Sequence, residues 1–187
     1  MKSFTFYLIC AIFLITDESY ADSSRKKAET SFYDNGNIYL LRHALAPGTG
    51  DPDNFDVNDC ETQRNLSNAG RSQAIRIGKK LRDKLKILPQ VFTSQWCRCK
   101  DTAKYAFGNF KEFTALNSTF QSPYNKNEPK QLKELYNFVK KWDGKGKNLV
   151  LVTHYSIITA VTNAVPSSGE IVITDKNFEV LGTIQTD

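Results

Sequence analysis

Short apolar runs alternate with amphipathic stretches along most of the chain, a pattern that predicts strands separated by helices. The runs expected to form buried strands cover residues 37–42, 90–93, 148–153, 170–173 and 178–181. The last two are joined by Asp175-Lys176-Asn177, which is typical of a hairpin loop. Phe113–Leu116 is a further candidate strand in an otherwise irregular segment.

The segments between the strands carry apolar residues at helical spacing. Ser67 is a favourable N-cap for the first of them, Gly108 ends the second, and Pro129 suits the first turn of the third. The expected helices cover residues 68–85, 101–107, 129–142 and 157–164. Because strands alternate with helices, the predicted fold class is α/β: a three-layer αβα sandwich around a mostly parallel central sheet.

The chain has 187 residues, enough for one domain with a substantial core and too few for two. Its formal net charge of +5 suits an anionic ligand. The largest basic cluster, from Lys79 to Lys86, falls on a predicted helix and is expected to be a solvated face. The dense basic stripe of a nucleic-acid-binding protein is absent, so no nucleic-acid partner is expected.

The N-terminal residues resemble a secretory signal. Lys2 precedes an apolar stretch, Phe4–Ile15, that is shorter than the roughly 20 residues needed to span a bilayer. Ser19 and Ala21 place small residues where a signal peptidase requires them. We expect cleavage after Ala21, a periplasmic or secreted protein, and no stable membrane insertion afterwards; an uncleaved anchor is the alternative. The predicted organisation is a signal peptide (1–21), an exposed lead-in (22–36) and one domain (37–187).

Three cysteines, Cys60, Cys97 and Cys99, would remain after cleavage. An oxidising compartment favours one disulfide and one free thiol. Cys60 is expected to pair with Cys97 or with Cys99, since a bridge between Cys97 and Cys99 would be strained. A zinc site is the alternative, but three cysteines with no histidine beside them do not supply its four ligands.

Both histidines of the chain follow strand-like runs. His43 comes directly after Arg42 at the end of the first strand, and His154 follows the run 148–153. Open α/β sheets bind ligands at the carboxyl ends of their strands, where arginine can hold an oxyanion and neutral histidine can attack phosphorus. Arg98 stands where the second strand leads into a helix, which also favours an anion. Together these positions predict a phosphate site.

Four motifs occur in the order found in the histidine phosphatase superfamily, which the chain resembles over roughly residues 37–174. They are Leu41-Arg42-His43-Ala44, Leu66-Ser67-x-x-Gly70-x-x-Gln73-Ala74, Thr93-Ser94-x-x-x-Arg98-x-x-x-Thr102-Ala103 and Val152-Thr153-His154. The resemblance implies the phosphoglycerate-mutase-like fold, and the size is most similar to that of the compact, exported bacterial members.

The resemblance also implies a mechanism. His43 would be the nucleophile that forms a phosphohistidine, while Arg42, Arg98 and His154 would stabilise the phosphoryl oxygens in the transition state. It implies no metal and no other cofactor. The implied substrates are phosphorylated small molecules, lipopolysaccharide phosphates, phosphoproteins or phosphohistidine. A non-catalytic phosphate-binding protein of the same fold and a phosphomutase are the alternatives.

Three positions depart from the family's pattern. Ala44 replaces the glycine of the Arg-His-Gly signature, which still allows close approach of a phosphate if its φ is negative. Asn117 lies near the expected place of the acidic proton donor, and an amide cannot supply that proton. Tyr155 stands where the phytase-like branch has aspartate, which argues against that branch.

Glu170 is the first candidate for the missing acid, because its strand is expected to neighbour the strand that ends at His154. Carboxylates of the long loop after the first strand, among them Asp51, are the other candidates. Arg64, just before the first predicted helix, is a candidate for substrate binding at the rim of the pocket.

Overall fold

The computed structural model describes residues 32–85 and 87–186. The chain divides into two units, residues 1–34 and 35–187, and the second unit carries the sheet and all the described helices. The predicted signal peptide and most of the predicted lead-in lie outside the described residues. Within the described ranges, no helix is long and apolar enough to cross a bilayer.

Six strands of the described chain form one mixed sheet. They are β1 (Ile38–Arg42), β2 (Gln90–Thr93), β3 (Lys111–Glu112), β4 (Leu149–Thr153), β5 (Ile171–Thr174) and β6 (Val180–Ile184), in the spatial order β3-β2-β4-β1-β5-β6. The pairs β3–β2, β2–β4 and β4–β1 are parallel, whereas β5 is antiparallel to both β1 and β6. The predicted α/β class with a mostly parallel sheet is therefore confirmed.

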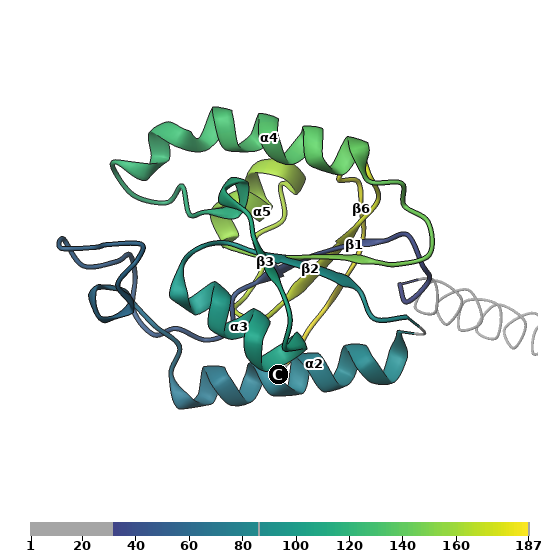
Figure 1. The fold of residues 1–187 in the computed structure, drawn as a ribbon, viewed down its shortest axis with the longest axis horizontal. Coiled ribbons are helices and arrows are strands. Elements are labelled where there is room, and N and C mark those ends of the chain that lie inside the picture. Colours follow the sequence, from purple (N-terminus) through teal and green to yellow (C-terminus); the bar gives the residue numbers. More distant parts are fainter. Residues whose placement is uncertain (1–31, 86, 187) are drawn as a thin grey trace, which may run out of the picture. The chain divides into compact units, whose positions relative to one another are not determined.

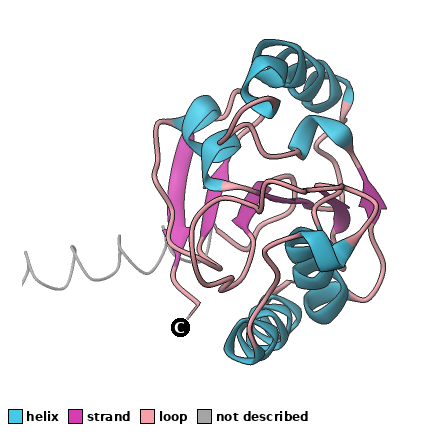
Figure 2. Cartoon of the chain, turned by 90° about the vertical axis from the view of Figure 1, so that its left-hand side faces the viewer, coloured by secondary structure: helices cyan, strands magenta, loops and turns pink. Residues whose placement is uncertain are grey.

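Helices cover both faces of this sheet. They are α2 (Asn68–Lys84), α3 (Cys97–Phe107), α4 (Glu128–Lys141) and α5 (Tyr155–Thr162). Helices α2 and α3 pack together on one face, and α4 and α5 pack together on the other (Figure 1). Figure 2 shows the same layers from the side. Ser67 caps α2 as predicted, since its Oγ accepts a hydrogen bond from the Gly70 N–H at 3.1 Å.

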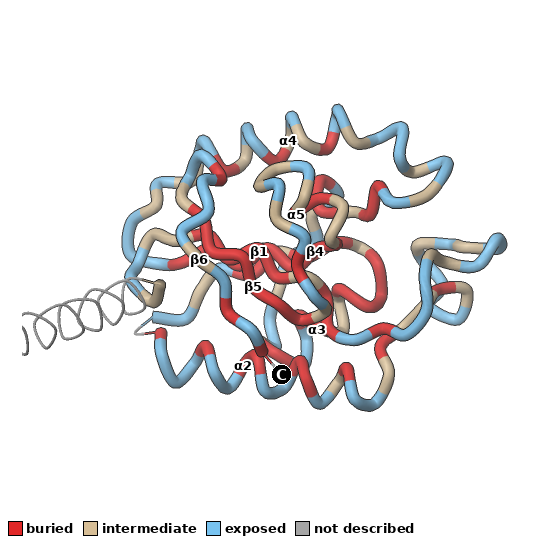
Figure 3. The backbone as a smooth tube through the Cα atoms, turned by 180° about the vertical axis from the view of Figure 1, so that it is seen from behind, coloured by how far each residue is buried: buried red, intermediate tan, exposed pale blue. Residues whose placement is uncertain are grey.

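The central strands carry the core. Every residue of β4 and β5 is buried, and the tube in Figure 3 is red along these strands while the outer turns of the helices are exposed. A main cluster joins alternate residues of β1 and β4 to the inner faces of α4 and α5. Strands buried on both faces are continuous apolar runs, which is why the sequence pattern identifies them. The carboxyl ends of β1 and β4 are therefore fixed by packing on two sides.

Two sequence predictions about the strands are wrong. Residues 114–116 form a 3-10 helix, because Ala115 and Leu116 turn inward into the core, and the neighbouring strand is the exposed pair Lys111–Glu112. The strand that follows Glu170 pairs with β1 and not with β4. Both edges of β4 are already occupied, by β2 and by β1, so β5 joins the remaining edge of β1.

Candidate active site

The carboxyl ends of β1 and β4 lie side by side. The parallel register pairs Arg42 with Thr153, so the next residues, His43 and His154, leave the sheet together. The backbone N–H of His43 donates to the Thr153 carbonyl at 2.9 Å, and the two imidazole ring centroids are 5.4 Å apart. The backbone ladder thus brings both histidines to one site at the edge where ligands of α/β sheets bind.

His43 is held as a neutral imidazole with a defined tautomer. Its Nδ1 lies 2.8 Å from the Ala44 carbonyl oxygen, which can only accept, so Nδ1 carries the hydrogen and Nε2 keeps its lone pair. The ring is buried, with 2 % of the residue exposed. Burial, followed by the charge of Arg98, lowers the pKa of His43 well below its ordinary 6.5. The side chain is therefore a candidate nucleophile over a wide pH range.

His154 is oriented through Ser94 and Asn117. The Asn117 Oδ1 accepts from the Gln95 backbone N–H at 2.9 Å and lies 3.2 Å from the Ser94 Oγ, so the hydroxyl donates to Asn117. The Ser94 Oγ then accepts from the His154 Nε2, 2.9 Å away. Burial, followed by the charge of Arg98, lowers the pKa of His154 well below 6.5. Asn117, near the expected place of the family's acid, thus fixes the tautomer of His154 through a serine.

Three arginines line the same pocket as the histidines: Arg42, Arg64 and Arg98. Arg42 donates from Nη1 to the Pro166 carbonyl at 2.8 Å, and its guanidinium lies 5.3 Å from the ring centroid of Tyr155. Arg64 donates from Nε to the Gly50 carbonyl at 2.7 Å and from Nη1 to the Ala46 carbonyl. The sequence prediction placed Arg64 at the rim, and the structure places it among the lining residues.

Arg98 is paired with a carboxylate of the long loop. Its Nη1 lies 2.7 Å from Asp51 Oδ1 and its Nη2 lies 3.1 Å from Asp51 Oδ2. Burial alone would raise the pKa of Asp51, but the hydrogen bonds and charge of Arg98 outweigh burial, and the pKa falls below its ordinary value. Asp51 is therefore ionised and is a poor candidate for the missing acid.

The pocket itself is small, and two aromatic rings belong to its lining. Its volume is about 130 Å³, and besides the basic residues it is lined by Gly48, Thr49, Gly50, Ser118, Phe120 and Tyr155. The Phe120 and Tyr155 rings lie edge to face with centroids 5.5 Å apart. Among the described residues that line it there is no carboxyl group. The described part of the chain also holds no cluster of three or more His, Cys, Asp or Glu side chains suited to a metal ion.

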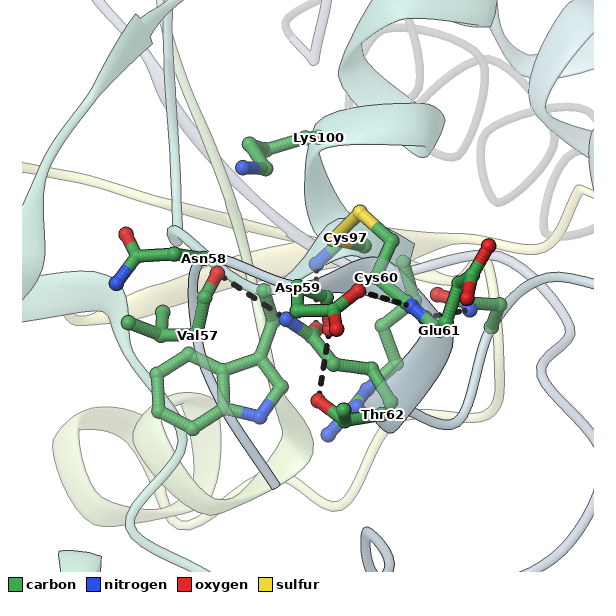
Figure 4. The surroundings of a disulfide bond; sticks show 12 residues. Val57, Asn58, Asp59, Cys60, Glu61, Thr62, Cys97 and Lys100 are labelled. Atoms are coloured by element: carbon green, nitrogen blue, oxygen red, sulfur yellow. Dashed lines mark hydrogen bonds between the residues drawn. A yellow bond between two sulfur atoms is a disulfide. The ribbon is translucent and has the colours of Figure 1, made fainter. Parts of the chain in front are cut away.

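A disulfide anchors the loop that supplies Asp51 and Arg64. It joins Cys60, in a short 3-10 helix of this loop, to Cys97, the first residue of α3 (Figure 4). The Cys97 backbone N–H also donates to the Gln63 Oε1 at 2.9 Å. The prediction of one disulfide and one free thiol is confirmed. Cys60 is bonded to Cys97, and Cys99 is free and buried.

Comparisons with known proteins identify the fold. No family model and no curated protein sequence matches the chain. The TTHB049 protein of Thermus thermophilus superposes with a TM-score of 0.55 at 19 % identity, over 81 % of this chain and 99 % of that one. SixA of Agrobacterium tumefaciens, a candidate phosphohistidine phosphatase, superposes with a TM-score of 0.54 at 18 % sequence identity. The match covers 80 % of this chain and 97 % of SixA. A phosphoglycerate mutase, also from Thermus thermophilus, superposes with a TM-score of 0.50 at 20 % sequence identity. That match covers 81 % of this chain and 99 % of the mutase. The chain therefore has the phosphoglycerate-mutase-like fold.

One departure from the histidine phosphatase pattern, Ala44, is accommodated by local structure. Ala44 is fully buried, and its backbone is outside the positive-φ region, which among described non-glycine residues only Asn163 and Phe178 enter. Its N–H donates to the Thr102 Oγ1 at 2.9 Å, and that hydroxyl donates to the Arg98 carbonyl at 2.7 Å. The motif threonine thereby couples the strand end to the helix that carries Arg98.

Glu170, the first candidate for the missing acid, does not line the pocket. Its carboxylate accepts from the Ser167 backbone N–H at 2.8 Å and closes the turn before β5. The structure brings together the other candidates, Arg42, His43, Arg64, Arg98 and His154. Sequence reasoning missed the pairing of Asp51 with Arg98 and the contacts of Asn117. The pattern gave no signal for either, because both are side-chain contacts between segments far apart in sequence.

Proposed function

We propose that the chain is a phosphoric monoester hydrolase that works through a phosphohistidine on His43. The observation that carries this proposal is the buried, neutral imidazole whose Nδ1 is committed to the Ala44 carbonyl, in a pocket with three arginines. Such a ring has its Nε2 lone pair free for attack on phosphorus. The structural relatives support the same chemistry, although at their level of identity they establish only the fold.

In the first step the Nε2 lone pair of His43 forms the bond to phosphorus, and the bond from phosphorus to the leaving oxygen breaks with its electron pair. Arg42, Arg64 and Arg98 offset the charge on the three equatorial oxygens. In the second step water attacks the phosphohistidine, releases phosphate and restores the neutral ring. A volume of about 130 Å³ suits the phosphoryl group and leaves the rest of the substrate at the mouth.

The experiment that tests the function is trapping of the intermediate. Acid-labile, base-stable phosphate should be recovered on the wild-type protein after rapid quenching. His43→Ala should carry none and should lose several orders of magnitude in turnover. Turnover retained by His43→Ala would contradict the mechanism. Phosphate binding without any turnover in the wild type would instead favour the non-catalytic phosphate-binding protein.

The substrate preference should follow from the absence of a carboxyl group among the described lining residues. General acids typically contribute about 10²- to 10⁴-fold, and only poor leaving groups need them. Aryl phosphates should therefore react faster than alkyl phosphates by a factor in this range. Glu170→Gln is the control for the remaining acid candidate: it should leave the aryl-to-alkyl ratio unchanged, since the Glu170 carboxylate closes a turn. Equal rates for both ester classes would show that an acid operates.

Export belongs to the same proposal. A disulfide between Cys60 and Cys97 is consistent with an oxidising compartment, and the apolar N-terminal stretch supports secretion. The mature protein should begin at Asp22, which the intact mass of material from the cell envelope or medium would show. Recovery of the full-length chain from the cytoplasm would contradict export without touching the mechanism.

A further inference from the structure

The carboxylate of Asp51, which lies on the long loop after β1, accepts four hydrogen bonds at the site. Its Oδ1 accepts from Arg98 Nη1 at 2.7 Å and from the Arg64 backbone N–H at 3.1 Å. Its Oδ2 accepts from Arg98 Nη2 at 3.1 Å and from Trp96 Nε1 at 3.0 Å. The side chains of Arg98 and Asp51 are 3 % and 5 % exposed, so this bidentate ion pair, called the fork below, is almost completely shielded from solvent. A bidentate pair of this kind fixes both the position and the plane of a guanidinium.

The bidentate pair leaves one nitrogen of Arg98 without any partner. The Nε of Arg98 is buried and has no hydrogen-bond partner among the described residues, and the same holds for the Nε of Arg42. Buried donors almost always have a hydrogen-bond partner. The unpaired Nε atoms of two pocket-lining arginines therefore indicate that a ligand accepts hydrogen bonds from them when it is bound. The acceptors that fit are phosphoryl oxygens.

Asp51 also sets the charge of the pocket. With the histidines neutral, the three arginines and this carboxylate leave a net charge of +2 around the pocket. That value matches the dianion of a phosphate monoester. Without Asp51 the excess positive charge would favour tight retention of inorganic phosphate, the product of the proposed reaction.

We infer that Asp51 is a positioning residue of the active site: it holds Arg98 so that its remaining donors meet the phosphoryl oxygens in the transition state. This inference rests on the proposed phosphatase function. Asp51 acts through Arg98 and transfers no proton. Its loss should therefore impair the chemical step more than it impairs binding of phosphate.

A double-mutant cycle tests this role with an aryl phosphate as substrate. Asp51→Asn should reduce kcat by about 10- to 100-fold, the range expected when a charged group is misplaced by an ångström. KM and the inhibition constant of inorganic phosphate should change by less than about threefold or decrease, because one negative charge is removed. In an Arg98→Ala background, Asp51→Asn should cost almost nothing further, since the two residues act as a unit. Asp53→Asn, an exposed carboxylate of the same loop, is the matched control.

Three outcomes would overturn the inference: an unchanged kcat in Asp51→Asn, a loss that is equal in the wild-type and Arg98→Ala backgrounds, or a loss that appears only in KM. Asp51→Glu, which keeps the charge, should regain part of the lost kcat. If Asp51→Asn fails to fold, Arg98→Lys probes the same fork, because lysine cannot form it; a kcat loss below about threefold there also overturns the inference. Failure of the proposed function is distinguishable, because the wild-type protein would then form no phosphohistidine.

Discussion

The two halves of the candidate active site are positioned by different kinds of contact. The strand-end half consists of Arg42, His43 and His154, which follow directly from the paired ends of β1 and β4. The loop half consists of Asp51 and Arg64, which lie on an extended segment without regular ladder pairing and are held by side-chain hydrogen bonds and one disulfide. The first half depends on the backbone of a buried sheet, and the second depends on individual side chains.

This difference suggests a division of work. Backbone hydrogen bonds in a buried ladder survive most side-chain substitutions, so the nucleophile and its partner histidine are placed as securely as the core itself. The loop half can loosen while the sheet stays folded. Damage to the strand-end half should therefore remove the nucleophile or its partner histidine, whereas damage to the loop half should leave the nucleophile in place and misalign the arginines around the phosphoryl group.

The largest effect should come from the strand-end half. His154→Ala removes the pocket-lining imidazole that packs edge-on against the His43 ring and should reduce kcat by about 10²-fold, the cost expected when a reacting group is misplaced by an ångström. Cys99→Ala is the matched control. Its thiol lies 3.4 Å from His154 Nε2 but does not line the pocket, and burial raises its pKa to about 12, so it stays protonated. A comparable loss in Cys99→Ala would show that packing around His154, rather than the imidazole, is what matters.

A smaller effect is expected from the loop half. Replacing Cys60 and Cys97 by serine opens a bridge that spans 37 residues of sequence. Loop-closure entropy predicts a loss of about 3–4 kcal/mol in the free energy of unfolding, often less in practice. Denaturant titration measures that loss. Affinity for vanadate should also fall, while the phosphohistidine on His43 should still form. Loss of the phosphohistidine in the folded double variant would contradict the division between the two halves.

The same division explains what the sequence could predict. The strands at 37–42, 90–93 and 148–153 were identifiable because each is a buried apolar run bounded by turn residues. The pocket-lining residues Arg42, His43, Arg98 and His154 stand at or shortly after the carboxyl ends of these strands. The cap at Ser67 and the hairpin before β6 also follow from local chemistry. Local sequence therefore specified the strand-end half.

The remaining features depend on contacts between distant segments. Nothing in the pattern indicates that Asp51 pairs with Arg98, because the segment around Asp51 has neither helical nor strand periodicity. The wrong neighbour assumed for the strand of Glu170 has a similar cause. Both β1 and β4 are uniformly apolar, so the pattern cannot state which of them offers a free edge to β5. Sheet order depends on how the connections pack, which a single strand does not encode.

The smallest effect is a dependence of stability on pH, and it also separates the two halves. In the folded state the pKa of His43 and that of His154 lie well below the ordinary 6.5, through burial first and the charge of Arg98 second. Between 6.5 and the folded values, the unfolded chain binds more protons than the native one. Stability should therefore fall as the pH drops below 6.5, by about 1.4 kcal/mol per pH unit for each histidine.

The loop half should respond only at lower pH. The pKa of Asp51 lies below its ordinary 3.8, so the stability that this carboxylate contributes is lost only as the pH falls through its folded value. Urea unfolding between pH 7 and pH 5 isolates the histidines. Glutamine cannot gain a proton. His43→Gln should therefore reduce the slope of the unfolding free energy against pH by the contribution of one proton, about 1.4 kcal/mol per pH unit, whatever its effect on stability at pH 7. An unchanged slope in His43→Gln would mean that His43 has the same pKa in the folded and unfolded states. That result would contradict the neutral, desolvated nucleophile on which the proposed mechanism depends.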